Sequence, residues 1–175
     1  MRTEALIDRE LDNVLAALTP ANALVCQVSL HTGLRVSDVL KLKTAELAPR
    51  MWVMESKTKK KKQIGLPGPL LEAIKAQAGT IYAFPSRDGT GHRTRQAVWA
   101  DCKRAARAFR LPQNVGAHSM RKTYAADVMA AYGDIERVRK ALNHSSQSVT
   151  MLYLIAANNV RTQAQRPRPV RFRRR

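Results

Sequence analysis

The chain has 175 residues, 45% of them hydrophobic and 25% charged, which is typical of one globular domain with its own hydrophobic core. With 31 lysines and arginines against 13 acidic residues, its net charge of +18 favours a polyanionic partner, most simply nucleic acid, although such charge can also serve solubility alone. A leader sequence and an apolar stretch long enough to cross a bilayer are both missing, so we expect a soluble, cytoplasmic protein rather than a secreted or membrane-bound one.

The first part of the chain predicts three helices. Apolar residues spaced as on one helix face cover residues 11–18. Thr19-Pro20 is typical of a helix start, because proline is favoured at the first helical position, and this second helix should end at Gly33. A short third helix, capped by Ser37, is expected to follow.

The middle of the chain predicts a small antiparallel sheet and one helix. Residues 51–56 and 63–66 resemble the two strands of a hairpin, with a lysine-rich turn between them. Gly68-Pro69 opens a helix that should end at Gly79. Residues 82–84 predict a brief additional strand.

The last predicted elements are helices. Thr94 should cap a long helix, and the residues expected on its inner side are Val98, Trp99, Cys102, Ala106 and Phe109. Two more helices are expected over residues 118–131 and 134–142. A final helix, capped by Ser146, should carry Tyr153.

These elements predict an α+β fold that is mainly α-helical, with a small antiparallel β-sheet. Residues 1–159 are expected to form the domain. Residues 160–175 contain arginine and proline without apolar periodicity, so they predict a basic, flexible C-terminal tail. The only two cysteines, Cys26 and Cys102, lie in apolar helical patterns, so we expect buried thiols rather than a disulfide.

Six residues along the chain are of the types that could together cleave a phosphodiester without a metal. They are Arg35, Lys57, His118, Arg121, His144 and Tyr153. The reaction needs a nucleophile, cationic groups that stabilise a pentacoordinate phosphorane, and an acid for the departing oxygen. Arginine suits the second need, because its planar guanidinium stays charged and donates two hydrogen bonds to phosphate oxygens.

Each of these residues also has a simpler explanation. An isolated arginine usually forms a surface salt bridge, and an aromatic ring on an amphipathic helix usually packs in the core. The phenol of Tyr153 has an ordinary pKa of about 10, so it can act as a nucleophile only beside positive charge. His118 and Arg121 are three positions apart and should share a helix face, where the histidine could exchange protons near neutral pH.

A lysine at the hairpin turn could enter the minor groove and protonate the leaving 5′ oxygen. Chemistry alone does not distinguish Lys57 from the lysines that follow it, which we expect to form a solvated loop that attracts phosphate. The residues expected to contact DNA outside the catalytic set are Lys59, Lys60, Lys61, Lys62, Arg93 and Arg95.

The ordered set resembles the catalytic domain of the tyrosine recombinases, the phage integrase family, over about residues 8–155. Residues 32–38 (TGLRVSD) resemble the first arginine motif, in which Asp38 would orient Arg35. Residues 55–58 (ESKT) resemble the lysine hairpin, which favours Lys57. Residues 118–121 (HSMR) and 142–146 (LNHSS) resemble the His-x-x-Arg and Leu-Gly-His boxes, with asparagine in place of the glycine, and Tyr153 falls at the usual interval.

The resemblance implies a site-specific DNA recombinase or integrase of a phage or other mobile genetic element. Tyr153 would attack a DNA phosphate, form a 3′-phosphotyrosyl link and free a 5′ hydroxyl, which Lys57 would protonate. His118 would assist proton transfer, and the phosphate would be held by Arg35, Arg121 and His144. The covalent intermediate keeps the bond energy, so no metal or other cofactor is expected. The implied partners are double-stranded DNA and further copies of the chain, in a homo-tetramer on paired sites.

Two alternatives to a recombinase stay open. A type IB topoisomerase uses related chemistry as a monomer, although lysine is common at the position of His118 in that group. A noncatalytic nucleic-acid-binding module would use the basic surface alone. Members of the family usually carry a separate N-terminal helical domain, and the first motif arrives too early for one, so we expect either an excised catalytic domain or a naturally short member.

Overall fold

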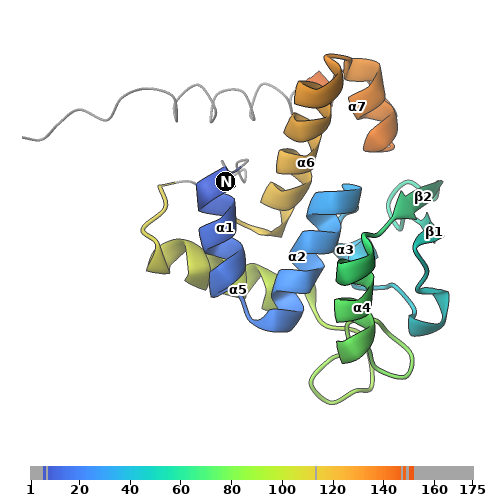
Figure 1. Ribbon diagram of the computed structural model, residues 1–175, viewed down its shortest axis with the longest axis vertical. Helices are drawn as coiled ribbons and strands as arrows, with labels where there is room; N and C mark the ends of the chain where they lie inside the picture. The colour runs from blue at the N-terminus through green and yellow to red at the C-terminus, as the bar shows by residue number, and fades with distance from the viewer. Residues whose placement is uncertain (1–5, 7, 113, 147, 149, 152–175) are drawn as a thin grey trace, which may run out of the picture.

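The computed structural model describes residues 6, 8–112, 114–146, 148, 150 and 151 of the chain. Its helices are α1 (Asp8–Ala17), α2 (Pro20–Thr32), α3 (Val36–Val39), α4 (Gly68–Gln77), α5 (Arg95–Ala108), α6 (Ala117–Tyr132) and α7 (Ile135–Ala141), with a 3-10 turn, η1, at Thr44–Glu46. Strands β1 (Arg50–Met54) and β2 (Lys61–Gly65) form a two-stranded antiparallel sheet. The predicted fold class is therefore confirmed (Figure 1).

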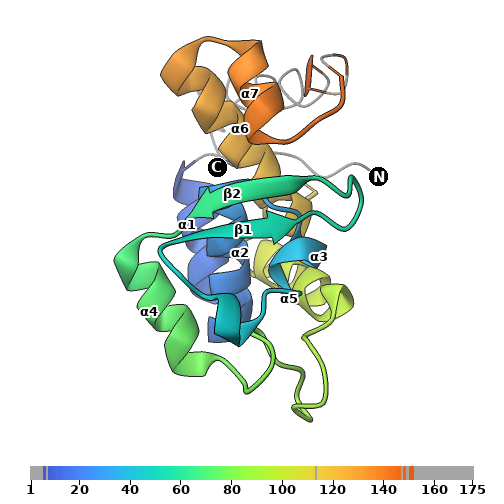
Figure 2. The same cartoon turned by 90° about the vertical axis from the view of Figure 1, so that its right-hand side faces the viewer.

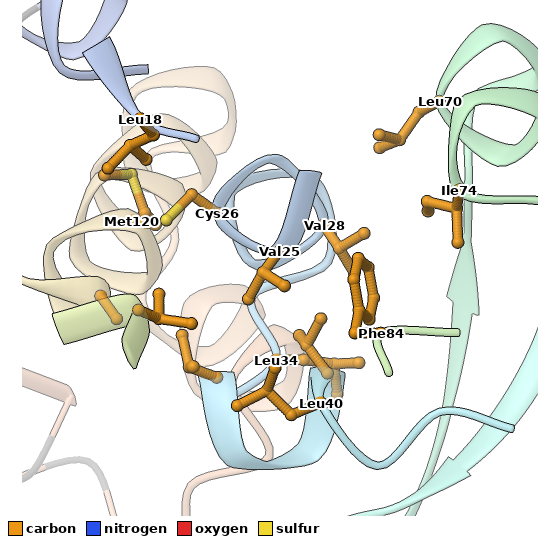
Figure 3. Close-up of a cluster of buried hydrophobic side chains, with 14 of the residues drawn as sticks. Leu18, Val25, Cys26, Val28, Leu34, Leu40, Leu70, Ile74, Phe84 and Met120 are labelled. Atoms are coloured by element: carbon orange, nitrogen blue, oxygen red, sulfur yellow. The ribbon is translucent and has the colours of Figure 1, made fainter. Parts of the chain in front are cut away.

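Helix α2 is central to the domain and packs against α1, α4, α5 and α6. It begins and ends where the sequence predicts, with Pro20 in its first turn and Gly33 as its C-cap residue. Its buried side chains pack against aliphatic and aromatic side chains from other elements (Figure 3). Cys26 of α2 lies beside Cys102 of α5 with the two sulfurs 4.0 Å apart, and both are buried free thiols, as predicted.

Gly33 sets how closely the end of α2 approaches α6. Its φ of 66° lies in the left-handed region that favours glycine. A Cβ atom at this position would lie 2.5 Å from ring atoms of Tyr124 in α6, which is too close for any side chain. The chain can therefore turn tightly against α6, and Arg35 follows two residues later.

The hairpin of β1 and β2 crosses one side of α2, and α6 and α7 lie beyond one edge of it (Figure 2). The strands pair from Arg50 with Gly65 to Met54 with Lys61, so both Lys61 and Lys62 belong to β2 rather than to the turn. Residues 82–84 do not form the predicted strand. Tyr82 makes only an isolated bridge with Lys43, because no second strand runs beside it there.

Two further details of the predicted elements are wrong. Helix α3 begins at Val36 with Arg35 as its N-cap residue, so Ser37 lies inside the helix and does not cap it. Trp99 and Phe109 were expected on the inner side of α5 but are 53% and 42% exposed, because the core covers only the narrower stripe that includes Val98. None of the helices in the described ranges is both long and apolar enough to cross a membrane.

Candidate active site

Arg35 and Arg121 converge on one buried carboxylate. Nη1 of Arg35 lies 3.1 Å from Oε2 of Glu55, and Nη1 of Arg121 lies 3.7 Å from Oε1 of the same side chain. Arg35 is 18% exposed and Arg121 is 1% exposed, whereas Glu55 is not exposed at all. The two guanidinium groups therefore lie together, and Arg35 is the one that reaches the surface.

Backbone carbonyl groups hold Arg121 in this position. Its Nη1 donates to the carbonyl oxygen of Gly33, and its Nη2 donates to that of Leu142 at 2.7 Å. Both acceptors follow the end of a helix, where carbonyl groups have no intrahelical partner. Arg121 thereby joins the end of α2, just before Arg35, to the end of α7, just before His144.

Two acidic side chains tie the hairpin turn to the arginines. The backbone N–H of Ser56 donates to Oδ1 of Asp38 at 2.9 Å, and the hydroxyl of Thr58 donates to Oε2 of Glu55 at 2.7 Å. Asp38, which the sequence suggested would orient Arg35, lies 4.0 Å from it. Glu55 makes the closer contact with Arg35, and Asp38 also anchors the hairpin.

The pKa of Glu55 reflects this environment. Burial alone would raise it, but the Thr58 hydroxyl and the charges of Arg35 and Arg121 outweigh burial and hold the pKa of the Glu55 carboxyl below its usual value. Glu55 is therefore ionised at neutral pH and serves as the counter-ion of both arginines.

A hollow of about 490 Å³ opens beside Arg35. Arg35, Lys57 and His118 all line it, and so do Arg95 and Trp99 of α5. Lys57 is exposed at the hairpin turn, and His118 lies in the first turn of α6. Three of the six predicted catalytic residues therefore share one concave, basic surface.

Both predicted histidines are held neutral in the free protein. His118 is exposed at the hollow, but desolvation by neighbouring groups, followed by the charge of Arg121, lowers its pKa to about 4. Burial, followed by the charge of Arg121, lowers the pKa of His144 to about 4. His144 is buried three residues after α7, and its Nδ1 lies 3.1 Å from Oγ1 of Thr150. Each imidazole can therefore accept a proton or a hydrogen bond at neutral pH.

The lowered pKa of His144 predicts how stability depends on pH. Between about pH 6.5 and about pH 4 the unfolded chain binds a proton at His144 that the folded chain does not. The free energy of unfolding should therefore fall as the pH falls through this interval. In urea titrations, His144→Asn should reduce this slope. An equal slope in His144→Asn and wild type would contradict the burial of a neutral His144.

The remaining predicted residues are placed as follows. Tyr153 lies outside the described residues, as does the predicted tail of residues 160–175. Lys59, Lys60 and Lys61 are exposed, and Arg93 is half-buried. Lys62 is not part of a solvated loop, because its amine lies inside and donates to the carbonyl oxygens of Thr32 and Ala141.

Sequence reasoning missed Glu55 as a counter-ion of the arginines, and it assigned Lys62 to DNA contact rather than to the interior. Glu55 is the one acid in the basic segment of residues 55–62, and an acid between an apolar strand and a run of lysines could have been noticed. Lys62 alternates with Ile64 and Leu66, so a period of two would have placed it on the inner face of β2. Within the described ranges, no three His, Cys, Asp or Glu side chains are grouped so as to hold a metal ion.

Comparisons with known proteins identify relatives of this chain. The sequence model described as the phage integrase family matches residues 5–159. The probable integrase/recombinase YoeC of Bacillus subtilis is 32% identical over 131 residues, covering 71% of this chain and 72% of that protein. Tyrosine recombinase XerD of Rhizobium meliloti is 30% identical and covers 81% of this chain.

A solved structure shares the fold. The XerH site-specific recombinase, bound to its palindromic difH substrate after cleavage, superimposes with a TM-score of 0.72 at 19% identity and covers 93% of this chain. The present chain spans 49% of the XerD relative and 52% of the XerH chain, or about half of each.

Proposed function

This chain belongs to the phage integrase family, and on that premise we propose that it cleaves and rejoins DNA strands through a 3′-phosphotyrosyl intermediate. The convergence of Arg35 and Arg121 on Glu55, beside the hollow that Lys57 and His118 line, is the observation that supports this most strongly. Two guanidinium groups around one anion are the arrangement that a phosphorane requires.

In the proposed reaction Tyr153 attacks the scissile phosphate and Arg35 binds a nonbridging oxygen. Lys57, exposed at the turn, protonates the 5′ oxygen as it leaves. His118 accepts and returns a proton at the hollow, where a bound phosphate would raise its low pKa toward neutrality. His144 donates a hydrogen bond to the phosphate.

Arg121 lies deeper in the protein interior than the sequence suggested. Its side chain is 1% exposed and donates to two backbone carbonyl groups. It can therefore contact a phosphate only after DNA binding replaces one of these hydrogen bonds with a hydrogen bond to the phosphate. Until then its charge adds to the positive potential at Arg35 and keeps both histidines neutral.

The proposed partner is double-stranded DNA, bound by a domain of residues 1–159 that works as a homo-tetramer on paired sites. XerH was solved on a palindromic substrate, which supports a DNA partner for its relatives. The basic tail of residues 160–175 would add nonspecific phosphate contacts, which makes affinity strongly dependent on salt. The proposed location is with DNA in the cytoplasm of a prokaryotic cell.

The test is covalent capture on nicked duplexes whose cleaved fragment diffuses away. Since the target sequence is not fixed by the site, the duplexes carry a randomised core, and protein–DNA adducts are isolated by denaturing electrophoresis and sequenced. We expect a 3′-linked adduct enriched for one core sequence. Absence of any adduct would overturn the proposal, and relaxation of supercoiled plasmid with no strand exchange between enriched sites would overturn the recombinase assignment in favour of a topoisomerase.

A further inference from the structure

Lys62 occupies an unusual position for a lysine in a basic hairpin. It lies on the inner face of β2, and its amine donates to the carbonyl oxygens of Thr32 and Ala141 at 2.5 Å each. Thr32 is the last residue of α2 and Ala141 is the last residue of α7. Carbonyl groups at helix C-termini carry partial negative charge and lack intrahelical partners, so a cation between two of them is favourable.

The two acceptors have equivalent places in the sequence. Thr32 precedes Arg35 by three positions, and Ala141 precedes His144 by three positions. Arg121 binds the next carbonyl in each segment, those of Gly33 and Leu142. Two cations, Lys62 from β2 and Arg121 from α6, therefore join the same pair of helix ends, and each end leads directly into a residue of the proposed phosphate site.

The environment of Lys62 separates it from the neighbouring lysines. Burial, followed by the charge of Arg121, lowers the pKa of Lys62 to about 8, while Glu55 opposes this and Arg35 adds to it. Its amine also lies 5.5 Å from the centre of the Tyr124 ring. Lys61, the preceding residue of the same strand, is exposed. An amine held by two carbonyl groups inside the domain is not available to a DNA phosphate.

We propose that Lys62 is a positioning residue, which fixes the spacing between Arg35 and His144 by joining the C-terminal ends of α2 and α7. The expected effect on rate rests on the proposed strand-cleavage function, but the contacts by which Lys62 joins the two helix ends are a property of the free protein. A displacement of about 1 Å between groups that act on one phosphate can reduce the rate by about 100-fold.

The test compares Lys62→Met with Lys61→Met, which removes the same charge from the outer face of the same strand. Hydrogen–deuterium exchange in the free protein reports on residues 32–35 and 141–144. Single-turnover adduct formation at saturating DNA reports on the rate. We expect Lys62→Met to increase exchange in both segments and to slow cleavage by about 100-fold with little change in DNA affinity. Lys61→Met should weaken DNA binding and leave the exchange in both segments unchanged.

A second variant, Lys62→Arg, tests the inference even if Lys62→Met does not fold. Lys62→Arg keeps a charge that cannot be lost near pH 8 and keeps two donors for the two carbonyl groups. Wild-type cleavage should decline as the pH rises through about 8, and Lys62→Arg should lack that part of the decline. The charged groups that face Lys62, which are Arg121, Glu55 and Arg35, are common to both proteins.

Three results would overturn the inference. The first is that Lys62→Met shows the same exchange and the same cleavage rate as wild type. The second is that the defect of Lys62→Met is confined to DNA affinity, as in Lys61→Met. The third is that the cleavage rates of wild type and Lys62→Arg decline identically as the pH rises above about 8. If wild type forms no adduct at all, the proposed function fails, and the exchange comparison still decides whether Lys62 joins the two helix ends.

Discussion

Replacing Tyr153 with phenylalanine is expected to abolish the covalent adduct with DNA, slowing its formation by about 10⁴-fold or more, as loss of a nucleophile does in other enzymes. The substitution removes one hydroxyl and leaves the ring, so the stability of the protein and its DNA affinity should be unchanged. Phenol is a weak nucleophile at neutral pH, and the reaction depends on the cations of the proposed site to stabilise its anion. In the proposed reaction Arg35 at the hollow, together with the charge of Arg121, would supply that stabilisation.

The measurement is adduct formation on the enriched nicked duplex, followed by protease digestion and mass spectrometry of the DNA-linked peptide. Tyr132→Phe is the matched control, because Tyr132 is exposed at the end of α6 and should form the adduct at the wild-type rate. An adduct that forms equally well in Tyr153→Phe, or a linked peptide that contains another tyrosine, would show that the nucleophile is a different residue.

The helices were predictable because their boundaries are local. Thr19-Pro20, Gly33, Thr94 and Asp134 start or stop a helix through the conformation and hydrogen bonds of their immediate neighbours. Thr94 accepts a hydrogen bond from the N–H of Ala97, three positions later, which is the local signal that the sequence shows directly. Such contacts need no knowledge of the rest of the fold.

The exposure of Trp99 could not be predicted in the same way. It is next to the buried Val98 and sits at the edge of the apolar stripe of α5, so helical spacing alone allows it to face either the core or solvent. The outcome depends on which elements cover that edge. No element in the described part of the chain covers it, and the ring instead lines the hollow together with Arg35 and His118.

The motifs identified the residues of the candidate site but not how they are held. Lys62 contacts Ala141 across 79 positions and Arg121 contacts Gly33 across 88 positions, and no local pattern encodes separations of this size. For the same reason the sequence suggested Asp38 as the partner of Arg35, whereas Glu55 makes the closer contact from the hairpin. The site residues are thus readable from short motifs, and their counter-ions are decided by tertiary packing.

Replacing Arg121 with alanine should lower the free energy of unfolding by about 3–5 kcal/mol, in addition to suppressing cleavage. The side chain is 1% exposed and binds the carbonyl groups of Gly33 and Leu142. Its loss leaves these acceptors without that donor and removes one of the two guanidinium groups that, among the described residues, form ion pairs with the fully buried Glu55. A buried carboxylate that loses part of its charge compensation, together with two carbonyl groups that lose a charged donor, is a costly defect in a protein interior.

Adding Glu55→Gln to Arg121→Ala should recover part of the lost stability, because the neutral amide no longer needs a counter-ion. Urea unfolding of the wild type, both single variants and the double variant gives the coupling between the two charges. Arg137→Ala is the surface control: this residue is 61% exposed and 3.9 Å from Asp134, so its loss should cost less than about 1 kcal/mol. Additive effects of Arg121→Ala and Glu55→Gln would mean that the two charges do not compensate each other. The hydrogen bonds to the carbonyl groups of Gly33 and Leu142 would then account for the burial of Arg121. Arg121 would then act at the phosphate only after its side chain rearranges on DNA binding.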